Sequence, residues 1–421
     1  MNPLGARMRR ILIIGAGQAG LQLALTLLGH GGYDVTVMTA QTPEEIRDGR
    51  ITSTQCMFFP ALEIEREAGL NHWEEPAPWI EGQRVTLAGP GGQKLLETYG
   101  IWDAPAQSVD QRVKMSGWLE RVEKAGGRVV LHPVVTSDLE ALSRMYDLTL
   151  VAAGKGALVE LFDRDASRSP YDAPQRNLAA IYVRGVRPYP EHPTPHVRIN
   201  AVPGVGETYL MPALTTSGVC DAVLVEAVPG GPFDVFGDRR ISPDEHLRRL
   251  RALYAEWMPW EHELYAEAEP TDEFSTLYGG YAPVVRHPVG TVGDRHVLGM
   301  GDVVVLNDPG CGQGANNAAH CASIYHRAIV EHGDRPFTPE WMHRTFERYW
   351  EYSRWATALT NTMIGPLPEH VQQVLGVAST DDETARRFAR GYAVPPSLAD
   401  WFFDAEKAGA YLATRTPQPA E

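Results

Sequence analysis

The sequence predicts a mixed α/β protein in which a parallel sheet comes first, an antiparallel sheet follows, and helices make up the C-terminal region. Three observations predict this order. An apolar strand over residues 10–14 leads into a glycine-rich turn and a helix, as in a parallel α/β sheet. Short β-rich runs separated by proline and glycine fill residues 177–226, which is typical of antiparallel sheets. From residue 337 onward, apolar side chains recur at helical spacing.

The composition fits a globular protein with a large core. The chain has 421 residues, 43% of them hydrophobic, and a formal net charge of −15. This charge argues against binding to nucleic acid or to an anionic membrane surface. The four cysteines lack the C-x-x-C spacing of a zinc site, so neither a metal nor a disulfide framework is expected. No signal peptide or membrane-spanning stretch is evident, so a cytoplasmic location is expected.

The turn after the first strand is the most informative stretch of the chain. Residues 15–20 read Gly-Ala-Gly-Gln-Ala-Gly, the pattern G-x-G-x-x-G. Gly15 allows a tight turn, Gly17 lets a pyrophosphate approach the backbone, and Gly20 lets the following helix pack closely on the strand. The free N–H groups at the helix start attract phosphate. Between a buried strand and an apolar helix, the motif predicts a Rossmann-like dinucleotide site.

The second strand, at residues 34–38, ends where the ribose of a dinucleotide is normally bound. An acidic residue is usual about 20 residues beyond the glycines, but this chain has Thr39 there. The departure predicts weaker binding of the ribose and leaves Gln41 or Arg47 as the polar substitute. The polar, β-branched residues 50–55 either run beneath the cofactor or form an ordinary edge strand.

The chain then leaves the parallel sheet and returns to it. Proline, glycine and tryptophan in residues 60–100 predict an inserted hairpin or lobe. A helix is predicted over residues 109–125, and strands at residues 129–130 and 148–152 rejoin the sheet. The last of them ends beside Gly154 at the carboxyl edge, which is either a cofactor contact or a plain strand-to-helix turn.

The antiparallel region is followed by a helix and a second return to the first sheet. Ser242 is the predicted N-cap of a helix through Trp257, with Glu245 at the capping-box position. A buried strand over residues 295–302 then ends in Gly-Asp. The predicted antiparallel strands are residues 179–183, 196–201, 207–211 and 220–226.

The C-terminal region is predicted to be helical. One helix is expected from Glu340 to about Met363, with an aromatic stripe that most simply packs in a core. Residues 380–383 predict a second capping box, and residues 414–421 a frayed tail. The predicted domains are a dinucleotide-binding domain of residues 1–60, 100–176 and 291–336, a substrate-binding domain of residues 61–99 and 177–290, and a helical region of residues 337–421.

A second constellation lies at residues 299–318, where a strand ends in Gly-Asp, a glycine-rich loop follows, and a helix of small residues begins near Gln313. The carboxylate of Asp302 can accept hydrogen bonds from polyol hydroxyls. The helix start at residues 312–315 can stabilise negative charge on the ring of a reduced flavin. Two motifs far apart in sequence therefore predict one flavin dinucleotide, with a purely structural loop as the simpler alternative.

Together these motifs resemble those of the flavoprotein aromatic monooxygenases built like p-hydroxybenzoate hydroxylase. Within that group, the chain is most similar to the styrene and indole monooxygenases, which are two-component epoxidases. The likeness covers roughly the first 330 residues, and the helical C-terminus agrees in length rather than in motif. The features that carry it are residues 14–21, Thr39, Val109-Asp110 with Arg112, Ala153-Gly154-Lys155, Gly301-Asp302, Asp308-Pro309 and residues 312–316.

The resemblance implies an FAD-binding domain, a substrate domain and FAD as the cofactor. Single-component hydroxylases carry Asp-Gly after the strand that ends near Ala153, whereas this chain has Lys155-Gly156. The resemblance therefore implies FAD that arrives already reduced from a separate NADH-dependent flavin reductase, and it implies a possible homodimer. The candidate cofactor-binding residues are Gly15, Gly17, Ala19, Gly20, Thr39, Arg50, Arg112, Gly154, Asp302, Pro309, Gly312, Gly314, Ala315 and Asn316.

The implied reaction is transfer of one oxygen atom from a flavin C4a-hydroperoxide, formed with O₂, to the double bond of a small hydrophobic aromatic substrate such as styrene or indole. This electrophilic step needs no base to ionise the substrate, but it does need a dry, apolar cavity. We expect that cavity between the dinucleotide-binding domain and the sheet of residues 177–290. The candidate catalytic residues at the flavin edge are Ser53, Thr54, Pro309 and Gln313.

Several assignments have alternatives. Arg50 and Arg112 either bind phosphate or form surface salt bridges. Cys311 is more simply a small buried side chain than a redox group, and His72 with Trp73 is a candidate for the pocket wall. For the whole chain, the alternatives are a single-component NAD(P)H-dependent aromatic hydroxylase and a non-catalytic binder built like the GDP-dissociation inhibitors.

Overall fold

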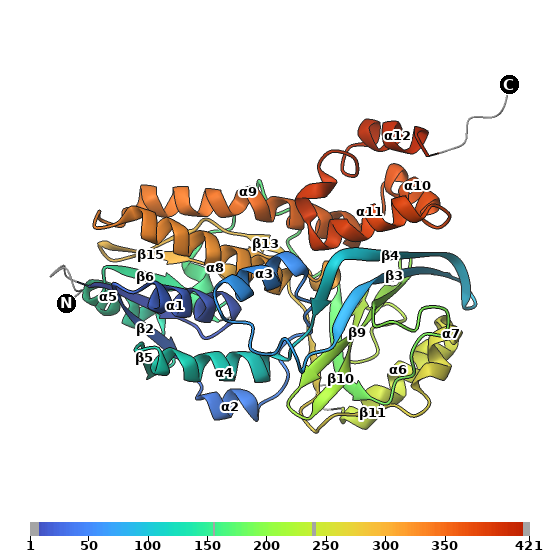
Figure 1. Ribbon diagram of the computed structural model, residues 1–421, viewed down its shortest axis with the longest axis horizontal. Coiled ribbons are helices and arrows are strands. Elements are labelled where there is room, and N and C mark those ends of the chain that lie inside the picture. Colours follow the sequence, from blue (N-terminus) through green and yellow to red (C-terminus); the bar gives the residue numbers. More distant parts are fainter. Residues whose placement is uncertain (1–7, 155, 238–240, 416–421) are drawn as a thin grey trace.

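A mainly parallel sheet forms one part of the computed structural model, which describes residues 8–154, 156–237 and 241–415 (Figure 1). Neighbouring strands run parallel except for one antiparallel hairpin at the edge. The central strand is apolar because residues 11–14 are buried. The strand order is β14 (Val289–Val292), β15 (Arg295–Gly299), β6 (Leu148–Val151), β1 (Arg9–Ile14), β2 (Tyr33–Thr39) and β5 (Arg128–Leu131).

Helices cover this sheet and share its core. α1 (Gln18–His30) packs against α4 (Gln111–Lys124) and α8 (Gln313–His332). The long helix α9 (Pro339–Ile364) lies along α8 (Figure 1), and its buried aromatic residues join the same core, as predicted. α5 (Thr136–Met145) packs on β6 and β15. The bounds predicted for α4 and α9 are therefore confirmed closely.

The second sheet has eight strands, and the antiparallel character predicted for it is confirmed, apart from one parallel pair. That pair joins β3 (Trp79–Gly89) to β8 (Val197–Val202). The hairpin of β3 and β4 (Gln93–Gln107) therefore extends the sheet beyond β8. β12 (Thr276–Gly279) also pairs with β7. The order is β11 (Glu269–Pro270), β7 (Asn177–Arg184), β10 (Gly218–Ala227), β9 (Gly206–Thr215), β8 (Val197–Val202), β3 (Trp79–Gly89) and β4 (Gln93–Gln107).

Alternate residues of this sheet face two different cores. On β7, Ala179, Ile181 and Val183 pack toward α6 (Pro243–Trp257), whereas Ala180 and Tyr182 join the core beneath the C-terminal helices. Ser242 caps α6 as predicted, with its side chain accepting from the Glu245 N–H at 3.2 Å. The remaining helices are α7 (Pro259–His262), α10 (Glu369–Ala378), α11 (Asp382–Ala393) and α12 (Ala405–Ala413), and α11 packs on β4 (Figure 1).

Some local predictions differ from the structure. Residues 50–55 form no strand, and two helices that were not predicted, α2 (Pro43–Arg47) and α3 (Phe59–Glu67), flank them. The N-cap of α11 is Asp381, one residue after the predicted Thr380, because the Asp381 carboxylate accepts from the Thr384 N–H at 2.9 Å.

The predicted domain boundaries at 99/100 and 290/291 fall inside β4 and β14. A short antiparallel pair, β13 (Val284–Val285) with β16 (Val305–Leu306), lies near the second of them. Most of the predicted tail, residues 416–421, lies outside the described residues.

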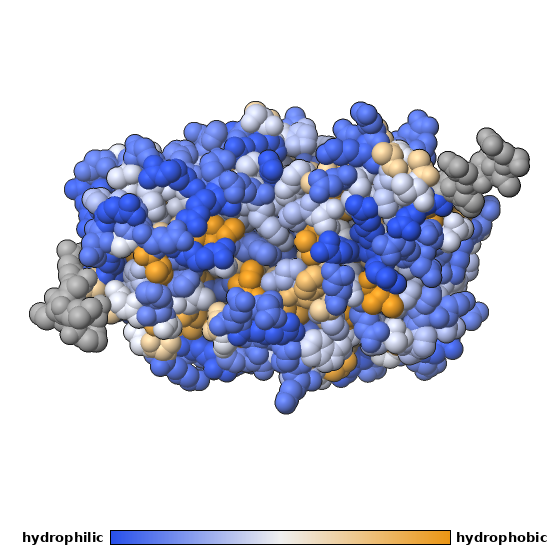
Figure 2. All heavy atoms as spheres, turned by 45° about the horizontal axis from the view of Figure 1, so that its top comes forward, coloured by the Kyte–Doolittle hydropathy of each residue, from blue (hydrophilic) through white to orange (hydrophobic). Residues whose placement is uncertain are grey.

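The surface is mainly hydrophilic on the face seen in Figure 2, where hydrophobic residues gather only in separate small patches. None of the helices in the described part of the chain combines the length and the apolar character that a membrane span requires.

Candidate flavin and substrate site

The first glycine turn lies at the carboxyl end of β1 and needs glycine at two positions for its own packing. Gly15 has a φ of 117°, and a Cβ atom there would lie 2.8 Å from the Ala152 carbonyl carbon. A Cβ atom on Gly20 would lie 3.2 Å from side-chain atoms of Ile13 and Ala152, which confirms close helix–strand packing. Gly17 differs, because no atom lies within 4 Å of its Cβ position. The open side of the turn is therefore at Gly17.

The second glycine motif meets the first at the same edge of the sheet. Gly301 has a φ of 60°, and its Cβ position is 3.0 Å from the Ala19 Cβ atom. The Cβ position of Gly154 is 2.8 Å from the Asp302 Cβ atom, and Asp302 itself is exposed. The carboxyl ends of β1, β6 and β15 lie side by side because these strands are parallel neighbours. Segments far apart in sequence thus form one edge, where ligands bind in such sheets.

Thr39 ends β2 at the position of the usual ribose acid. Its hydroxyl bonds with the backbone of Gln41, accepting from the N–H at 3.3 Å, and the side chain is buried. Arg47 forms an ion pair with Glu120 at 2.5 Å, so this guanidinium is engaged by α4. Of the two predicted substitutes, Gln41 is exposed, whereas Arg47 is held in this ion pair.

The turn of residues 308–312 leads directly into the start of α8 at this edge. The Asp308 carboxylate accepts from the Gly310 N–H at 3.1 Å, and Gly312 takes the left-handed conformation with φ 65°. Gly314 is exposed, Ala315 is half-buried, and nothing lies within 4 Å of the Gly314 Cβ position. The first N–H groups of α8 have no partner within the helix and carry its positive dipole end, so an anionic ring can be accommodated here.

Gln313 and Asn316 hold this turn against its neighbours. The Gln313 amide donates to the carbonyl oxygens of Cys311 and Tyr392, each at 2.8 Å. The Asn316 amide donates to the Cys56 and Gly312 carbonyl oxygens at 2.7 Å, and its own oxygen accepts from the Phe58 N–H at 2.9 Å. Both side chains are buried. In this structure they bind protein backbone, which fixes the start of α8 between α11 and the chain before α3.

Arg112 is the centre of a buried ion-pair network rather than a surface salt bridge. Its side chain is 3% exposed and pairs with Asp110 at 2.8 Å and with Asp272 at 3.0 Å. Further donations to Thr215 and Gly49 occupy the rest of its N–H groups. Exposed Arg50 donates to the Thr276 carbonyl and hydroxyl oxygens at 3.1 Å. Both arginines therefore tie the dinucleotide side of the molecule to the second sheet.

A second buried ion pair lies behind the glycine turn and was not predicted. Lys114 on α4 pairs with Glu65 on α3 at 2.5 Å, and Gln18, the first residue of α1, donates to the same carboxylate at 2.8 Å. All three side chains are buried. The three residues come from three different helices, so this buried pair can be recognised only once the helices are packed together, and no local sequence pattern predicts it.

An apolar cavity, named here the inter-sheet cavity, lies between the second sheet, the turn of residues 308–312 that follows the parallel sheet, and α11. It has a volume of about 30 Å³, so a bound aromatic molecule requires its lining side chains to move. Of the residues predicted to lie at the flavin edge, Thr54 and Pro309 line this cavity, and Ser53 bonds with Gln55 and Tyr182. The lining residues are Thr54, Gln55, Cys56, Phe58, Gln83, Trp102, Val197, Ile199, Tyr209, Met211, Leu224, Pro309, Gly310, Cys311, Gly312 and Tyr392.

The walls of this cavity contain residues that the sequence analysis missed. Ile199, Met211 and Leu224 share the sheet face that points to the cavity, and strand alternation could have indicated them. Phe58 packs edge-on against Trp102 at 5.1 Å between ring centroids, a contact that only packing reveals. Trp73 lies elsewhere, against Gly117 of α4, so the assignment of His72 with Trp73 to the pocket wall is wrong.

The cysteines of the described chain are buried and unpaired, and no cluster of acids, histidines and cysteines there could hold a metal ion. Burial raises the pKa of the Cys311 thiol, so it stays protonated. Cys311 is therefore a small wall residue of the cavity, as its simpler interpretation predicts.

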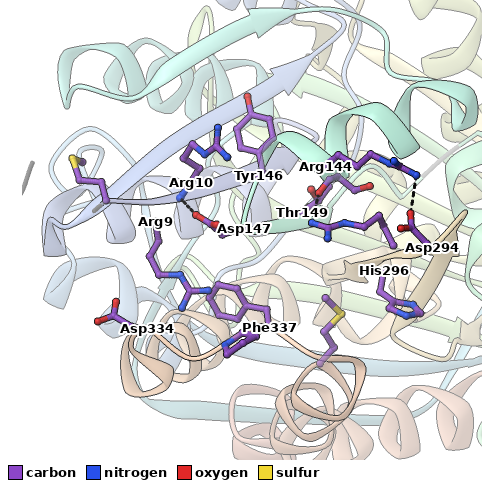
Figure 3. Close-up of a pocket in the computed structure, with 15 residues that line it drawn as sticks. Arg9, Arg10, Arg144, Tyr146, Asp147, Thr149, Asp294, His296, Asp334 and Phe337 are labelled. Carbon is purple, nitrogen blue, oxygen red and sulfur yellow. Dashed lines mark hydrogen bonds and ion pairs between the residues drawn. The ribbon is translucent and has the colours of Figure 1, made fainter. Parts of the chain in front are cut away.

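A larger cleft of about 770 Å³ lies at the amino ends of the strands of the parallel sheet, opposite their carboxyl ends (Figure 3). It is formed where β1, β6 and β15 begin, and several of its polar groups bond with one another. The Arg10 N–H donates to Asp147 at 2.8 Å, and Arg144 pairs with Asp294 at 2.9 Å. Ligands of parallel α/β sheets bind at the carboxyl ends of the strands, so this cleft is not the expected site.

Comparisons of the sequence with known proteins identify a family and two close full-length relatives. Residues 154–263 match the family described as "Styrene monooxygenase A putative substrate binding domain". Styrene monooxygenase StyA from Pseudomonas fluorescens is 31% identical over 97% of this chain and 99% of its own length. StyA from a Pseudomonas species is 30% identical with the same coverage.

Solved structures with low sequence identity share the fold. The flavin-dependent brominase Bmp2 has a TM-score of 0.64 at 15% identity, covering 96% of this chain and 98% of that one. A flavoprotein/dehydrogenase from Cytophaga hutchinsonii has a TM-score of 0.67 at 12% identity, covering 96% and 99%. The mixed α/β fold predicted from sequence is thus confirmed. By its full-length similarity to StyA, the chain belongs to the styrene monooxygenase family of flavin-dependent monooxygenases.

Proposed function

We propose that this chain is the oxygenase component of a two-component system that binds reduced FAD and epoxidises a small hydrophobic aromatic alkene such as styrene or indole. One observation carries the proposal. Among the described residues that line the inter-sheet cavity, none is charged and none is histidine. A phenol hydroxylase needs a base that ionises its substrate, whereas electrophilic attack on a double bond does not. An uncharged cavity beside the flavin edge therefore favours epoxidation.

The residues of the carboxyl edge fit a flavin dinucleotide. Open space at Gly17 leaves room for a pyrophosphate at the start of α1, and the carboxylate of exposed Asp302 would accept hydrogen bonds from a polyol chain. Gly154 and Gly301 bring the backbone of three strands close together there. Gly312, Gly314 and Ala315 would then offer the α8 N-terminus to the ring. When bound, the reduced flavin supplies the electrons that activate O₂.

The chain's own residues would orient the flavin ring and keep water away from it. Thr54 and Pro309 line the cavity and would contact the ring edge, while Gln313 and Asn316 hold the turn that carries Pro309 in place. Ile199, Met211 and Leu224 keep the cavity apolar, which protects a reactive oxygen species from water. In the proposed overall reaction, one oxygen atom of O₂ would be added to the double bond and the other released as water, with the electrons supplied by the reduced flavin. Ser53 supports Thr54 through its bond with Gln55.

The reductase partner is proposed from Thr39, which offers the ribose a weaker contact than a carboxylate and suits a protein that takes up and releases its flavin. Lys155, which stands in place of the acid of single-component enzymes, lies outside the described residues. Arg50 and Arg112 are proposed to hold the dinucleotide side and the second sheet in register, through the contacts described above.

The experiment supplies the purified chain with FAD, NADH and an unrelated flavin reductase under air, with styrene or indole. Styrene oxide or indigo is expected, and neither forms when the chain is omitted. Consumption of NADPH by the chain and FAD alone would instead support a single-component hydroxylase. Flavin binding without product from either alkene would remove the substrate, and absence of flavin binding would support a non-catalytic binder.

A further inference from the structure

A buried carboxyl group without any hydrogen-bond donor lies directly behind the flavin-side turn. Glu226 on β10 is 0% exposed, and neither of its oxygens has a donor within reach. A Cβ atom placed on Gly310 would lie 2.8 Å from the Glu226 Oε2 atom and 2.9 Å from the Tyr209 hydroxyl oxygen. Gly310 and Tyr209 both line the inter-sheet cavity. The Glu226 side chain therefore packs against Gly310 of this turn.

A second buried carboxyl group lies at the same turn as Glu226. Asp308 opens the turn, is 2% exposed, and accepts from the Gly310 N–H at 3.1 Å. The Gly310 Cβ position lies 2.8 Å from the Glu226 Oε2 atom and 3.4 Å from the Asp308 Oδ1 atom, so the two buried carboxyl groups converge on the same point of the turn. Ionised carboxylates only accept hydrogen bonds, so this contact is repulsive unless one of the two carries a proton. One proton between them gives Glu226 the partner that the protein otherwise does not provide.

The cation that faces the pair is already engaged by another carboxylate. Arg176 faces both groups but is held by Glu207 in a two-bond fork, at 2.7 Å and 2.9 Å. Burial, together with Asp308 and Glu207, raises the pKa of Glu226 well above its usual value. The other titratable groups that face the pair are Tyr171, Tyr209 on β9, Tyr281 before β13, Cys311 in the turn and Tyr392 on α11.

We propose that Glu226 and Asp308 share one proton, and that this pair positions the turn of residues 308–312 for the flavin. A single proton leaves one negative charge on the pair, and a hydrogen bond then links β10 to the turn. Without the proton, two negative charges would repel each other behind a ring that is itself anionic when reduced. That the turn meets a flavin depends on the function proposed above, whereas the shared proton does not.

The shared proton has a thermodynamic signature with a definite sign. The carboxyl group of an unfolded Glu loses its proton near pH 4.5, but the folded pair keeps it. Because the folded state then binds more protons, stability is highest below that pH and falls as pH rises toward the raised pKa. Each pH unit in this window costs about tenfold in the folding equilibrium constant.

The first arm compares the pH dependence of unfolding for the whole chain and for Glu226→Gln, which keeps the shape and a donor to Asp308 but cannot titrate. Between about pH 5 and about pH 7, the variant should gain stability relative to the parent chain. Glu351→Gln, an exposed change on α9, controls for the loss of one carboxyl group. A parent-to-variant difference that does not change with pH would overturn the shared proton.

The second arm measures the affinity for reduced FAD without O₂, by titration in the absence of substrate. Glu226→Gln should bind as the parent does, while Glu226→Leu, which leaves Asp308 without its hydrogen bond, should bind about tenfold more weakly. Equal affinity of the Leu variant would overturn the positioning role. If the parent chain binds no flavin at all, the proposed function fails, but the result of the first arm stands.

Discussion

At the scale of single residues, the glycine turn separates positions that the fold needs from a position that a ligand needs. Neighbouring backbone and side-chain atoms occupy the space that a Cβ atom on Gly15 or Gly20 would need, so the close packing here requires glycine at both positions. Gly17 has no such neighbour, so packing does not require glycine there and the position is open to an incoming group. The motif could be predicted from sequence because its spacing fixes all three roles, but which glycine faces open space required the coordinates.

Gly17→Val tests this separation. The variant should fold, since its Cβ atom meets nothing within 4 Å, at a cost of about 1 kcal/mol for a poor N-cap residue. Flavin binding should be lost, because the side chain occupies the approach to the backbone. Fluorescence titration with FAD and thermal unfolding measure the two effects. Gly29→Ala in the same helix, also with open space at its Cβ position, should keep both properties, and retained affinity in Gly17→Val would contradict the phosphate position.

Ile199→Ala tests the inter-sheet cavity. Removing this buried side chain should enlarge the cavity and raise kcat/KM for bulkier alkenes relative to styrene, at a cost of about 2–5 kcal/mol in stability. Ile181→Ala, buried on the opposite face of the same sheet, should lose similar stability without any change in substrate preference. The same relative rates in both variants would place the substrate outside this cavity.

At the scale of elements, helix caps and ion pairs show which features can be predicted from local sequence patterns. The sequence placed the start of α11 correctly within one residue, but it could not separate Thr380 from Asp381 as the cap. Thr380 instead donates back to the Val377 carbonyl oxygen at 3.3 Å and so belongs to the end of α10. The aspartate reaches the free N–H of Thr384. Asp381→Ala should therefore cost about 1 kcal/mol in thermal or chemical unfolding, and Thr380→Ala much less, whereas equal losses would contradict the cap assignment.

Arg112 shows what a motif cannot reveal. Its place after Val109-Asp110 was recognised, but its partners include Asp272 and Thr215, which are distant in sequence. Arg112→Ala should destabilise the protein by about 3–5 kcal/mol in chemical unfolding, because Asp110 is left buried without its partner. Arg47→Ala, which breaks a partly exposed pair with Glu120, should cost at most about 1 kcal/mol. Similar small losses in both variants would mean that the network does not join the two sheets.

At the scale of the whole molecule, the site exists because two sheets and the C-terminal helices meet. The glycine motifs and most strands could be predicted, since both depend on local patterns. The cavity could not, because Trp102, Ile199 and Leu224 come from separate strands and Tyr392 from a helix without a recognisable motif. Gln313, which was expected to act on the ring, reaches the Tyr392 carbonyl oxygen instead. The helical region therefore helps to build the site.

The most direct test of the account is a crystal structure of the chain with FAD and an unreactive styrene analogue. The account predicts the pyrophosphate beside Gly17, the ring between Thr54 and Pro309, and the analogue among Ile199, Met211 and Leu224. A dinucleotide bound in the cleft of Figure 3, or a ring turned away from the inter-sheet cavity, would contradict it.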